Sequence, residues 1–389
     1  MDAKEKLAFL KRGSVSLVSD EDLAKKLASG KPLRVKLGVD PTSADLHLGH
    51  SVVFQKLRAF QDLGHTAVLI IGDFTTRVGD PSGRDSTRPS LSIEDIKRNA
   101  ETYQEQAFKI LDREKTELRF NSEWLEGFMR DKLLDTLKRH TVQQILERED
   151  FKARLRENSP LTMLETLYPL LQGYDSVAIK ADVELGGNDQ LTNLLMGRKM
   201  QKDLGMEPQV ALTMPLLVGL DGSKKMSKSY GNYIAFNDEP NEMFGKAMRI
   251  SDDLMESYYE LLTSEPLELV RQRRQAEPMT LKKDLGQMLT TRYHGAEAGA
   301  AARKYFEDTF SKKELPTDIK AVDLPKGLAL SELVLRCGGV KSRNEARRLV
   351  SQGGVKIDGK KTAGDDPVSA PASFVLQIGK HQFVRVNLT

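Results

Sequence analysis

The stretch RVKLGVDPTSADLHLGHSVVFQKLRAFQDLGHTAVLIIGD, residues 34–73, decides the fold. Its apolar start, RVKLGVD, predicts a short strand that ends at Pro41. From His47 the apolar residues recur at helical spacing until Gly64, and TAVLIIGD then predicts a buried second strand. A strand, a helix and a strand within about 40 residues form a βαβ unit, in which the two strands are parallel and the crossover is right-handed.

The same alternation continues along the chain. Further strands are predicted at SVAIKAD (residues 176–182) and VALTMPLLV (residues 210–218), with the helical pattern LTNLLMGRKMQKDLG between them. The first part of the chain therefore predicts an α/β class fold, a doubly wound Rossmann-like domain with a parallel sheet.

The second half of the chain changes character twice. Residues 239–294 show charged helical patterns without a strand, and the two prolines and many charges of residues 311–327 predict a linker. The next part of the chain predicts a small α+β module. It begins with two short helices, and the segments VKIDGKK and FVLQIGKHQFVRVNL then predict strands joined by tight turns. The predicted parts are a catalytic domain at 1–236, an all-helical domain with its linker at 237–325, and the small module at 326–389.

Composition narrows the function classes. No apolar run approaches the ~20 residues that a membrane span needs. The single cysteine, Cys337, allows no internal disulfide and fits a reducing, cytoplasmic setting. Residues 326–389 carry 11 Lys and Arg against 5 Asp and Glu, whereas the rest of the chain carries 48 against 51. A basic end on an acidic body favours contact with a polyanion or, equally, a solubilising surface.

The segment HLGH, residues 47–50, follows the first predicted strand and opens a helix. Ligands bind at this edge of an α/β sheet, and a helix N-terminus favours phosphate. His47 and His50 share a helix face, and Gly49 leaves room for a flat base against the backbone. Helix capping by chance is the alternative, and a metal pair is disfavoured because no cysteine or acidic cluster lies beside them.

The segment KMSKS, residues 225–229, lies in LDGSKKMSKSYGN, which is rich in glycine, serine and lysine. Such a positive loop cannot pack in a core, but it can close over a triphosphate with Lys225 and Lys228 as point charges. An ordinary basic surface loop explains the lysines but not their pairing with HLGH. The two segments together predict a site that uses ATP.

At this point the sequence resembles the class I aminoacyl-tRNA synthetases, whose two signatures are of this kind. Four further segments resemble the motif series of the bacterial tyrosyl-tRNA synthetases in order and spacing. The terminal module is similar to the small RNA-binding domain that these enzymes share with a ribosomal protein. The motifs are DPTSADLHLGH (40–50), GDPSGR (79–84), LYPLLQGYDS (167–176), GGNDQ (186–190) and, in the module, VKSRNEARRLVSQGGVKIDG (340–359).

The resemblance implies an amino-acid pocket for L-tyrosine. Tyr168, Gln172 and Asp175 share one helix face, and their apolar neighbours predict half-burial, so these polar groups need partners. By resemblance, Asp175 accepts from the phenol hydroxyl, while Tyr168 and Gln172 hold the α-amino group. The full set implied by the resemblance is Lys36, Gly38, Asp40, Asp80, Tyr168, Gln172, Asp175 and Gln190.

Lys36 departs from the pattern of many tyrosyl enzymes, which carry a tyrosine at this position. We interpret the lysine as the mark of a second bacterial subgroup, the one with an intact KMSKS. A lysine cannot donate to the phenol in the same geometry. A surface-facing Lys36, with another group completing the pocket, is the alternative.

The resemblance also implies the chemistry. The tyrosine carboxylate attacks the α-phosphorus of ATP, so the task is positioning and stabilisation of charge. Magnesium accompanies ATP as part of the substrate, and no protein-bound metal is predicted. The catalytic residues implied are Thr42, His47, His50, Lys225 and Lys228, and the ATP-binding residues are His47, Gly49, His50, Asp189, Met226 and Lys228.

The predicted partner besides tyrosine and ATP is tRNA(Tyr). The helical domain is expected to meet the anticodon, and the basic module to bind RNA phosphates. A homodimer is expected by resemblance, and no membrane association is expected. The predicted RNA-binding residues are Lys341, Arg343, Arg347, Arg348 and Lys356.

Three alternatives stay open at the level of sequence. A small-molecule nucleotidyltransferase also uses HxGH, but it needs neither the helical domain nor the basic module. A tryptophanyl synthetase is near in fold, but Asp175 and the terminal module are not expected of it. An RNA-binding protein derived from a synthetase would have lost motif residues, whereas both signatures are intact.

Overall fold

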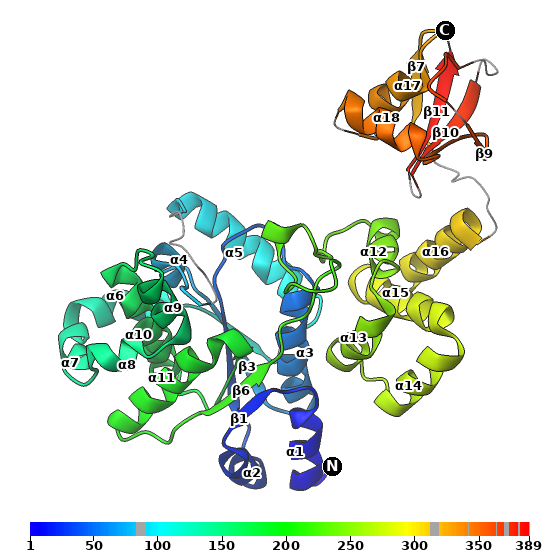
Figure 1. Cartoon of the computed structure of the whole chain (residues 1–389). Coiled ribbons are helices and arrows are strands. Elements are labelled where there is room, and N and C mark those ends of the chain that lie inside the picture. The colour runs from blue at the N-terminus through cyan, green and yellow to red at the C-terminus, as the bar shows by residue number, and fades with distance from the viewer. Residues whose placement is uncertain are drawn as a thin grey trace. The chain divides into compact units, whose positions relative to one another are not determined.

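A six-stranded sheet forms the core of the first part of the chain, in the strand order β1-β6-β5-β2-β3-β4 (Figure 1). Strands β6, β5, β2, β3 and β4 are parallel to their neighbours, and only the edge strand β1 pairs antiparallel, with β6. This order confirms the predicted parallel α/β fold, to which the structure adds β1 and β4 and in which β5 takes the place of the strand predicted at 176–182. The strands are β1 (Ser16–Val18), β2 (Arg34–Val39), β3 (Thr66–Ile71), β4 (Thr116–Phe120), β5 (Val183–Gly187) and β6 (Val210–Met214).

The computed structural model describes residues 1–82, 91–311, 319–340, 342–362, 364–368, 373–379 and 382–388. It separates into two compact units, Met1–Ala302 and Arg303–Thr389. In the described part of the chain no helix is long and apolar enough to cross a membrane.

Strand β3 explains why helices cover both faces of the sheet. Its side chains alternate between the faces, and all of them after Thr66 are buried. Leu69 and Ile71 pack in the cluster that includes helix α3, whereas Val68 and Ile70 pack with Ile179, just beyond helix α10. Figure 1 shows α3 on one side of the sheet and α10 with α11 on the other.

The strand predicted at residues 176–182 is wrong. Helix α10 (Met163–Ala178) ends within this segment, a turn follows it, and the next strand is β5, which begins at Val183. The half-buried Val177 packs among the helices, and the buried Ile179 packs against Val68 and Ile70 of the sheet. A short apolar run cannot be assigned to helix or strand by its periodicity alone.

Helices α10 and α11 pack closely because two glycines face each other's helix. A Cβ at Gly173 would lie 2.7 Å from Met200 Sδ, and one at Gly197 would lie 2.9 Å from Ser176 Oγ. These approaches bring the polar face of α10 against the sheet, where the cavity described below opens. The helices of the first unit are α1 (Ala3–Lys11), α2 (Asp20–Ala28), α3 (Leu48–Asp62), α4 (Thr75–Val78), α5 (Ile93–Ala107), α6 (Ser122–Asp131), α7 (Leu133–Leu137), α8 (Val142–Leu146), α9 (Glu149–Arg156), α10 (Met163–Ala178) and α11 (Leu191–Asp203).

The helical segment after the sheet shares its hydrophobic core with the sheet. Phe236 stacks on Tyr293 with ring centroids 4.4 Å apart, and the Tyr293 hydroxyl donates to Ser51 Oγ of α3 at 2.8 Å. The first compact unit accordingly extends to Ala302, and the domain boundaries expected from sequence stay predictions. The helices here are α12 (Pro240–Ala247), α13 (Met255–Leu262), α14 (Leu267–Ala276), α15 (Pro278–His294) and α16 (Ala296–Phe306).

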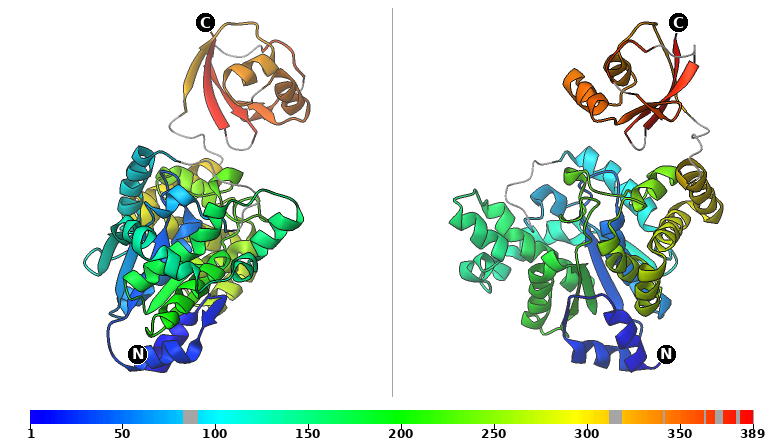
Figure 2. Two further views of the ribbon diagram at one scale, coloured as in Figure 1. Left: turned by 90° about the vertical axis from the view of Figure 1, so that its left-hand side faces the viewer. Right: turned by 45° about the vertical axis from the view of Figure 1, so that its right-hand side comes forward.

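The second unit is a small five-stranded sheet in the order β7-β11-β10-β8-β9, with α17 and α18 on one face (Figure 2). Its first strand, β7, lies inside the predicted linker, because it pairs parallel with β11 and so finds backbone partners; residues 312–318 are outside the described residues. The elements are β7 (Ala321–Leu324), α17 (Leu330–Arg336), α18 (Arg343–Ser351), β8 (Val355–Ile357), β9 (Lys360–Lys361), β10 (Ser373–Ile378) and β11 (Gln382–Leu388).

Candidate active site

A cavity of about 340 Å³ opens at the carboxyl ends of β2 and β5. An open α/β sheet binds ligands at this position, because helices leave for opposite faces there and a crevice remains. Three of the predicted site residues, Thr42, Lys228 and Lys36, lie beside the cavity and not in its wall. The predicted residues that line it are Gly38, Asp40, His47, Gly49, His50, Asp80, Tyr168, Gln172, Asp175, Asp189, Gln190, Lys225 and Met226.

Asp175 closes one end of the cavity. Its side chain is only 3% exposed. Trp124 Nε1 donates to one carboxylate oxygen at 2.8 Å, and Asn121 Nδ2 donates to the other at 3.4 Å. Burial raises the pKa of Asp175 to about 6, against the lowering effect of Lys36 and of these two donors. The carboxylate is therefore ionised at neutral pH and accepts hydrogen bonds only.

Tyr168 is a buried hydroxyl donor in the same wall. Its hydroxyl donates to Asp40 Oδ2 at 2.8 Å, and Thr75 Oγ1 donates to Asp40 Oδ1 at 2.7 Å. Burial, with the nearby carboxylates, raises the pKa of Tyr168 well above its ordinary value, so it stays protonated. Residue 72 must be glycine here, because a Cβ at Gly72 would lie 2.0 Å from Asp40 Oδ1.

Two amide side chains are held in fixed orientations around Asp80 and Glu184. Gln190 Nε2 donates to Asp80 Oδ2 at 2.8 Å, while Gln172 Nε2 donates to Glu184 Oε1 at 3.2 Å. Asp40, Asp80 and Asp175 all act on Tyr168 electrostatically, so three carboxylates surround this part of the cavity. A ligand with an ammonium group would offset this excess of negative charge.

Lys36 lies beneath the wall of the cavity and does not face the surface. Its side chain is 0% exposed, and its ammonium contacts Glu184 Oε1 at 2.8 Å. The surface-facing alternative is therefore wrong. The direct contact with tyrosine expected from sequence is replaced by contacts to α10, which carries Gln172 and Asp175.

The two histidines of HLGH together cap the N-terminus of helix α3. His47 Nδ1 accepts from the Gly49 backbone N–H, and His50 Nδ1 accepts from the His47 backbone N–H, both at 3.2 Å. Burial lowers the pKa of His47 to about 2 and that of His50 to about 4, helped by Lys228. A Cβ at Gly49 would lie 2.9 Å from the His47 ring. The two rings therefore cap the helix, as the alternative stated, and this does not exclude the predicted contact with phosphate.

The KMSKS loop is tied down at its base by Asn232. The Ser227 backbone N–H donates to Asn232 Oδ1 at 2.8 Å, and Asn232 Nδ2 donates to Asp221 at 2.7 Å. At the cavity, Lys225 Nζ lies 3.6 Å from Asp189 Oδ2. Burial raises the pKa of Asp189, against the opposing effect of Lys225.

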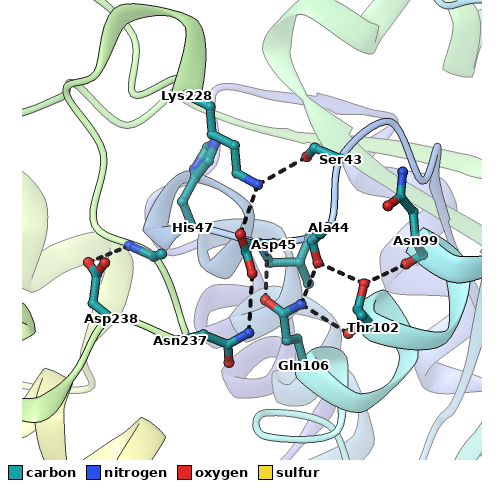
Figure 3. A network of polar contacts seen from close by, with 12 residues as sticks. Ser43, Ala44, Asp45, His47, Asn99, Thr102, Gln106, Lys228, Asn237 and Asp238 are labelled. Carbon is teal, nitrogen blue, oxygen red and sulfur yellow. Dashed lines mark hydrogen bonds and ion pairs between the residues drawn. The ribbon is translucent and has the colours of Figure 1, made fainter. Parts of the chain in front are cut away.

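Lys228 reaches from the loop to the segment before HLGH (Figure 3). Its ammonium donates to Ser43 Oγ at 3.2 Å and lies 3.5 Å from Asp45 Oδ2. Gln106 of α5 fixes the same segment, because it donates to Ala44 O and accepts from the Leu46 backbone N–H. Thr42, in this segment, makes a backbone hydrogen bond to Asp40 O at 2.8 Å. The basic loop and HLGH thus meet across the cavity mouth.

Sequence reasoning missed the residues that complete the Asp175 end. Trp124 and Asn121 come from the start of α6, and Thr75 from α4, so they lie about 50 residues or more from Asp175 in sequence. No spacing or motif marks them. The one hint in the composition is that the chain has a single tryptophan, whose indole N–H needs an acceptor when it is buried.

The predicted RNA-binding residues of the second unit lie mostly on α18. Arg343 and Arg347 are exposed, and they pair only loosely with Glu332 at 3.3 Å and Asp365 at 3.8 Å. Arg348 is also exposed, Lys356 on β8 is half-buried, and Lys341 lies outside the described residues. These cations are free to exchange their partners for phosphates.

Among the described residues no group of three or more His, Cys, Asp or Glu side chains is arranged to hold a metal ion.

Comparison with known proteins agrees with this geometry. The family model described as class I tRNA synthetases (W and Y) matches residues 28–311, and the S4 domain model matches residues 330–369. The tyrosine–tRNA ligase of Thermotoga maritima is 50% identical over 394 residues, covering 100% of this chain and 98% of that protein. Tyrosine–tRNA ligase 2 of Vibrio parahaemolyticus is 49% identical over 387 residues, covering 98% of each.

Solved structures show the same fold. The tyrosyl-tRNA synthetase of Archaeoglobus fulgidus, solved with L-tyrosine, superposes with a TM-score of 0.65 at 23% identity, over 78% of this chain and 100% of that one. The truncated mitochondrial enzyme of Aspergillus nidulans gives 0.65 at 20% identity, over 79% of this chain and 99% of that one.

A cavity at the switch point of a parallel sheet, with HLGH and KMSKS at its mouth, is the site of a class I aminoacyl-tRNA synthetase, and the matched model confirms that class. The near-complete match at about 50% identity makes the assignment specific. The chain belongs to the tyrosine–tRNA ligases. The resemblance inferred from the motifs is confirmed, and the nucleotidyltransferase and tryptophanyl alternatives fall away.

Proposed function

We propose that the cavity makes tyrosyl-adenylate and then passes the tyrosyl group to tRNA(Tyr). A tyrosine carboxylate oxygen attacks the α-phosphorus of ATP, the bond to the bridging oxygen breaks, and pyrophosphate leaves. A ribose hydroxyl of the terminal tRNA adenosine then attacks the tyrosyl carbonyl carbon, and AMP leaves. No covalent enzyme intermediate is needed.

The observation that carries this proposal is the buried acceptor at the end of the cavity. Asp175 has Trp124 and Asn121 as donors and retains the capacity to accept one more hydrogen bond. A phenol hydroxyl would supply it, whereas a phenylalanine ring would leave the carboxylate facing carbon. Tyr168, Gln172, Asp80 and Gln190 would hold the α-amino group, and Asp40 and Gly38 would complete that wall.

The phosphates would bind at the opposite mouth. His47 and His50 are neutral and cannot repel magnesium that arrives with ATP. Their rings, with the Thr42 hydroxyl, would donate to phosphate oxygens. Lys225 and Lys228 would leave Asp189 and Asp45 to pair with the pyrophosphate as its charge develops. Gly49, Asp189 and Met226 line the place for the nucleoside.

RNA binding would involve both the helical segment at the anticodon and the basic face of α18. The exposed Arg343 and Arg347 on that helix support the second contact. Their loose ion pairs cost little to break. Tyrosine, ATP and tRNA are cytoplasmic substrates, and the single Cys337 suits a reducing compartment.

We also propose a homodimer. Large apolar side chains are exposed on α7, α8 and the first turn of α10: Leu134 is 74% exposed, Val142 70% and Met163 82%. These helices flank one hydrophobic cluster. A second copy would bury such a patch. Light scattering should show a dimer that Val142→Asp weakens; a monomeric wild type would refute this part.

The test of the catalytic proposal is pyrophosphate exchange into ATP, measured with each of the twenty amino acids in turn. We expect exchange with tyrosine to be far faster than with any other amino acid, followed by transfer to tRNA(Tyr) on its addition. Exchange with no amino acid, or with tryptophan in place of tyrosine, would overturn the proposal.

A further inference from the structure

A fully buried ion pair lies directly beneath the tyrosine end of the cavity. Lys36 of β2 and Glu184 of β5 are neighbours in the parallel ladder, and they are 0% and 1% exposed. The Lys36 ammonium contacts Glu184 Oε1, Gln172 O and Ser176 Oγ, each at 2.8 Å. Each of its three N–H bonds therefore has a partner, and two of those partners belong to α10.

Both oxygens of the Glu184 carboxylate also accept hydrogen bonds. Its Oε1 accepts from Gln172 Nε2 at 3.2 Å, and its Oε2 accepts from Ser176 Oγ at 3.0 Å and from Gln209 Nε2. Gly197 makes room for this arrangement, because a Cβ there would lie 2.7 Å from Gln209 Nε2. Such a closed polar network fixes the side chains that compose it.

Gln172 is the member of the network that also lines the cavity. Because its amide nitrogen donates to Glu184, that nitrogen is turned toward the carboxylate and the amide oxygen points away from it. An oxygen accepts from an ammonium group, whereas an NH₂ in its place would repel one.

We propose that Glu184, held in place by Lys36, is a positioning residue that fixes the Gln172 amide with its oxygen toward the α-ammonium group of tyrosine. The proposal rests on the proposed function, since it concerns how tyrosine is held.

The same pair also affects the charge on Asp175, because the Lys36 ammonium is bound to Gln172 O and Ser176 Oγ on the turn of α10 that carries Asp175. Lys36 comes from β2, Glu184 from β5, Asn121 and Trp124 from the start of α6, and Tyr168 shares α10. Asp40 and Asp80 lie further along the wall. Lys36 lowers the pKa of Asp175 more than either hydrogen-bond donor does, and Glu184 raises it only weakly. Removal of the pair should therefore make Asp175 harder to ionise.

A purely structural ion pair is the competing explanation, and α10 offers a matched control. Arg154 and Glu165 form another buried pair, 2.7 Å apart, near the first turn of the same helix. Glu165 does not line the cavity. Glu165→Gln should therefore lower the melting temperature without a specific effect on tyrosine.

The experiment compares wild type, Lys36→Met, Lys36→Met/Glu184→Leu and Glu165→Gln by pyrophosphate exchange. The double variant leaves no buried charge without a partner, so it keeps the fold testable if the single variant is unstable. It also removes the acceptor that orients Gln172. We expect its KM for tyrosine to rise about tenfold while its KM for ATP stays within about twofold. Lys36→Met retains that acceptor, and its KM for tyrosine at high pH should stay within about twofold of wild type.

The pH profile supplies the second readout. In both Lys36 variants the acidic limb of kcat/KM for tyrosine should move to higher pH by about one unit, whereas Glu165→Gln should leave it in place. An unchanged KM for tyrosine in the double variant, or an equal rise in Glu165→Gln, would overturn the orienting role. An unmoved acidic limb would overturn the effect on Asp175. A wild type without tyrosine-dependent exchange would overturn the proposed function itself.

Discussion

The two ends of the cavity are built on different principles. At the tyrosine end, the buried Asp175 and Tyr168 are each held by a hydrogen bond of 2.8 Å, to the half-buried Trp124 and Asp40 respectively. At the phosphate end, the lysines of the KMSKS loop are partly exposed and lie 3.5 to 3.6 Å from their carboxylate partners. Choice of the amino acid therefore depends on preorganised partners, and phosphate chemistry on charges that can change partners.

The most severe way to break the tyrosine end is Asp175→Ala. This change removes the charged acceptor and leaves the Trp124 and Asn121 donors unpaired, so kcat/KM for tyrosine should fall about 10³-fold. Exchange with phenylalanine should fall much less, since phenylalanine has no hydroxyl to pair. Measurement of both substrates checks this, and an unchanged tyrosine-to-phenylalanine ratio would contradict the assigned role.

The matching break at the phosphate end is Lys228→Ala. Loss of one preorganised charge on the leaving pyrophosphate should lower kcat of exchange about 10²-fold and leave KM for tyrosine unaltered. Lys224→Ala is the control from the same loop, because its ammonium lies over the Tyr230 ring, 4.9 Å from the centroid. Equal losses in both variants would show a general effect of loop charge.

The pH dependence sharpens the comparison. Asp175, with a pKa of about 6, must be ionised, so kcat/KM for tyrosine should fall about tenfold per pH unit below that value. The histidine pKa values of about 2 and 4 lie below this window, so the phosphate end should not titrate in it. Profiles at saturating ATP between about pH 5 and 8 test this; a flat profile would refute it.

The smallest effect is expected from Trp124→Phe. The aromatic ring remains, but the Nε1 donor to Asp175 is lost, so KM for tyrosine should rise about threefold. The acidic limb should also move to higher pH, because that donor lowers the pKa of Asp175. Exchange assays that measure KM for tyrosine as a function of pH test both expectations. A lower KM would show that Trp124 does not contribute to tyrosine binding.

The elements predictable from sequence were those with local signatures. Short stretches rich in apolar residues marked β2 and β3, and HLGH marked the start of α3, because both signals depend on neighbours in sequence. The segment at 176–182 misled because the end of a buried helix is as apolar as a strand.

The site divides in the same way. Tyr168, Gln172 and Asp175 share a helix face, which spacing reveals. Trp124 reaches Asp175 through tertiary packing alone, and Lys36 meets Glu184 only because β2 and β5 are adjacent and in register. The environment of Lys36 depends on the order of the strands in the sheet, and local sequence patterns do not predict that order.

The mutual capping of His47 and His50 fixes where their protons reside. Since each Nδ1 accepts a backbone N–H and both rings are neutral, the single ring proton must sit on Nε2. Each imidazole therefore presents one N–H outward before any nucleotide arrives. The helix that begins here selects the donor tautomer, so no proton needs to move when a phosphate binds or leaves.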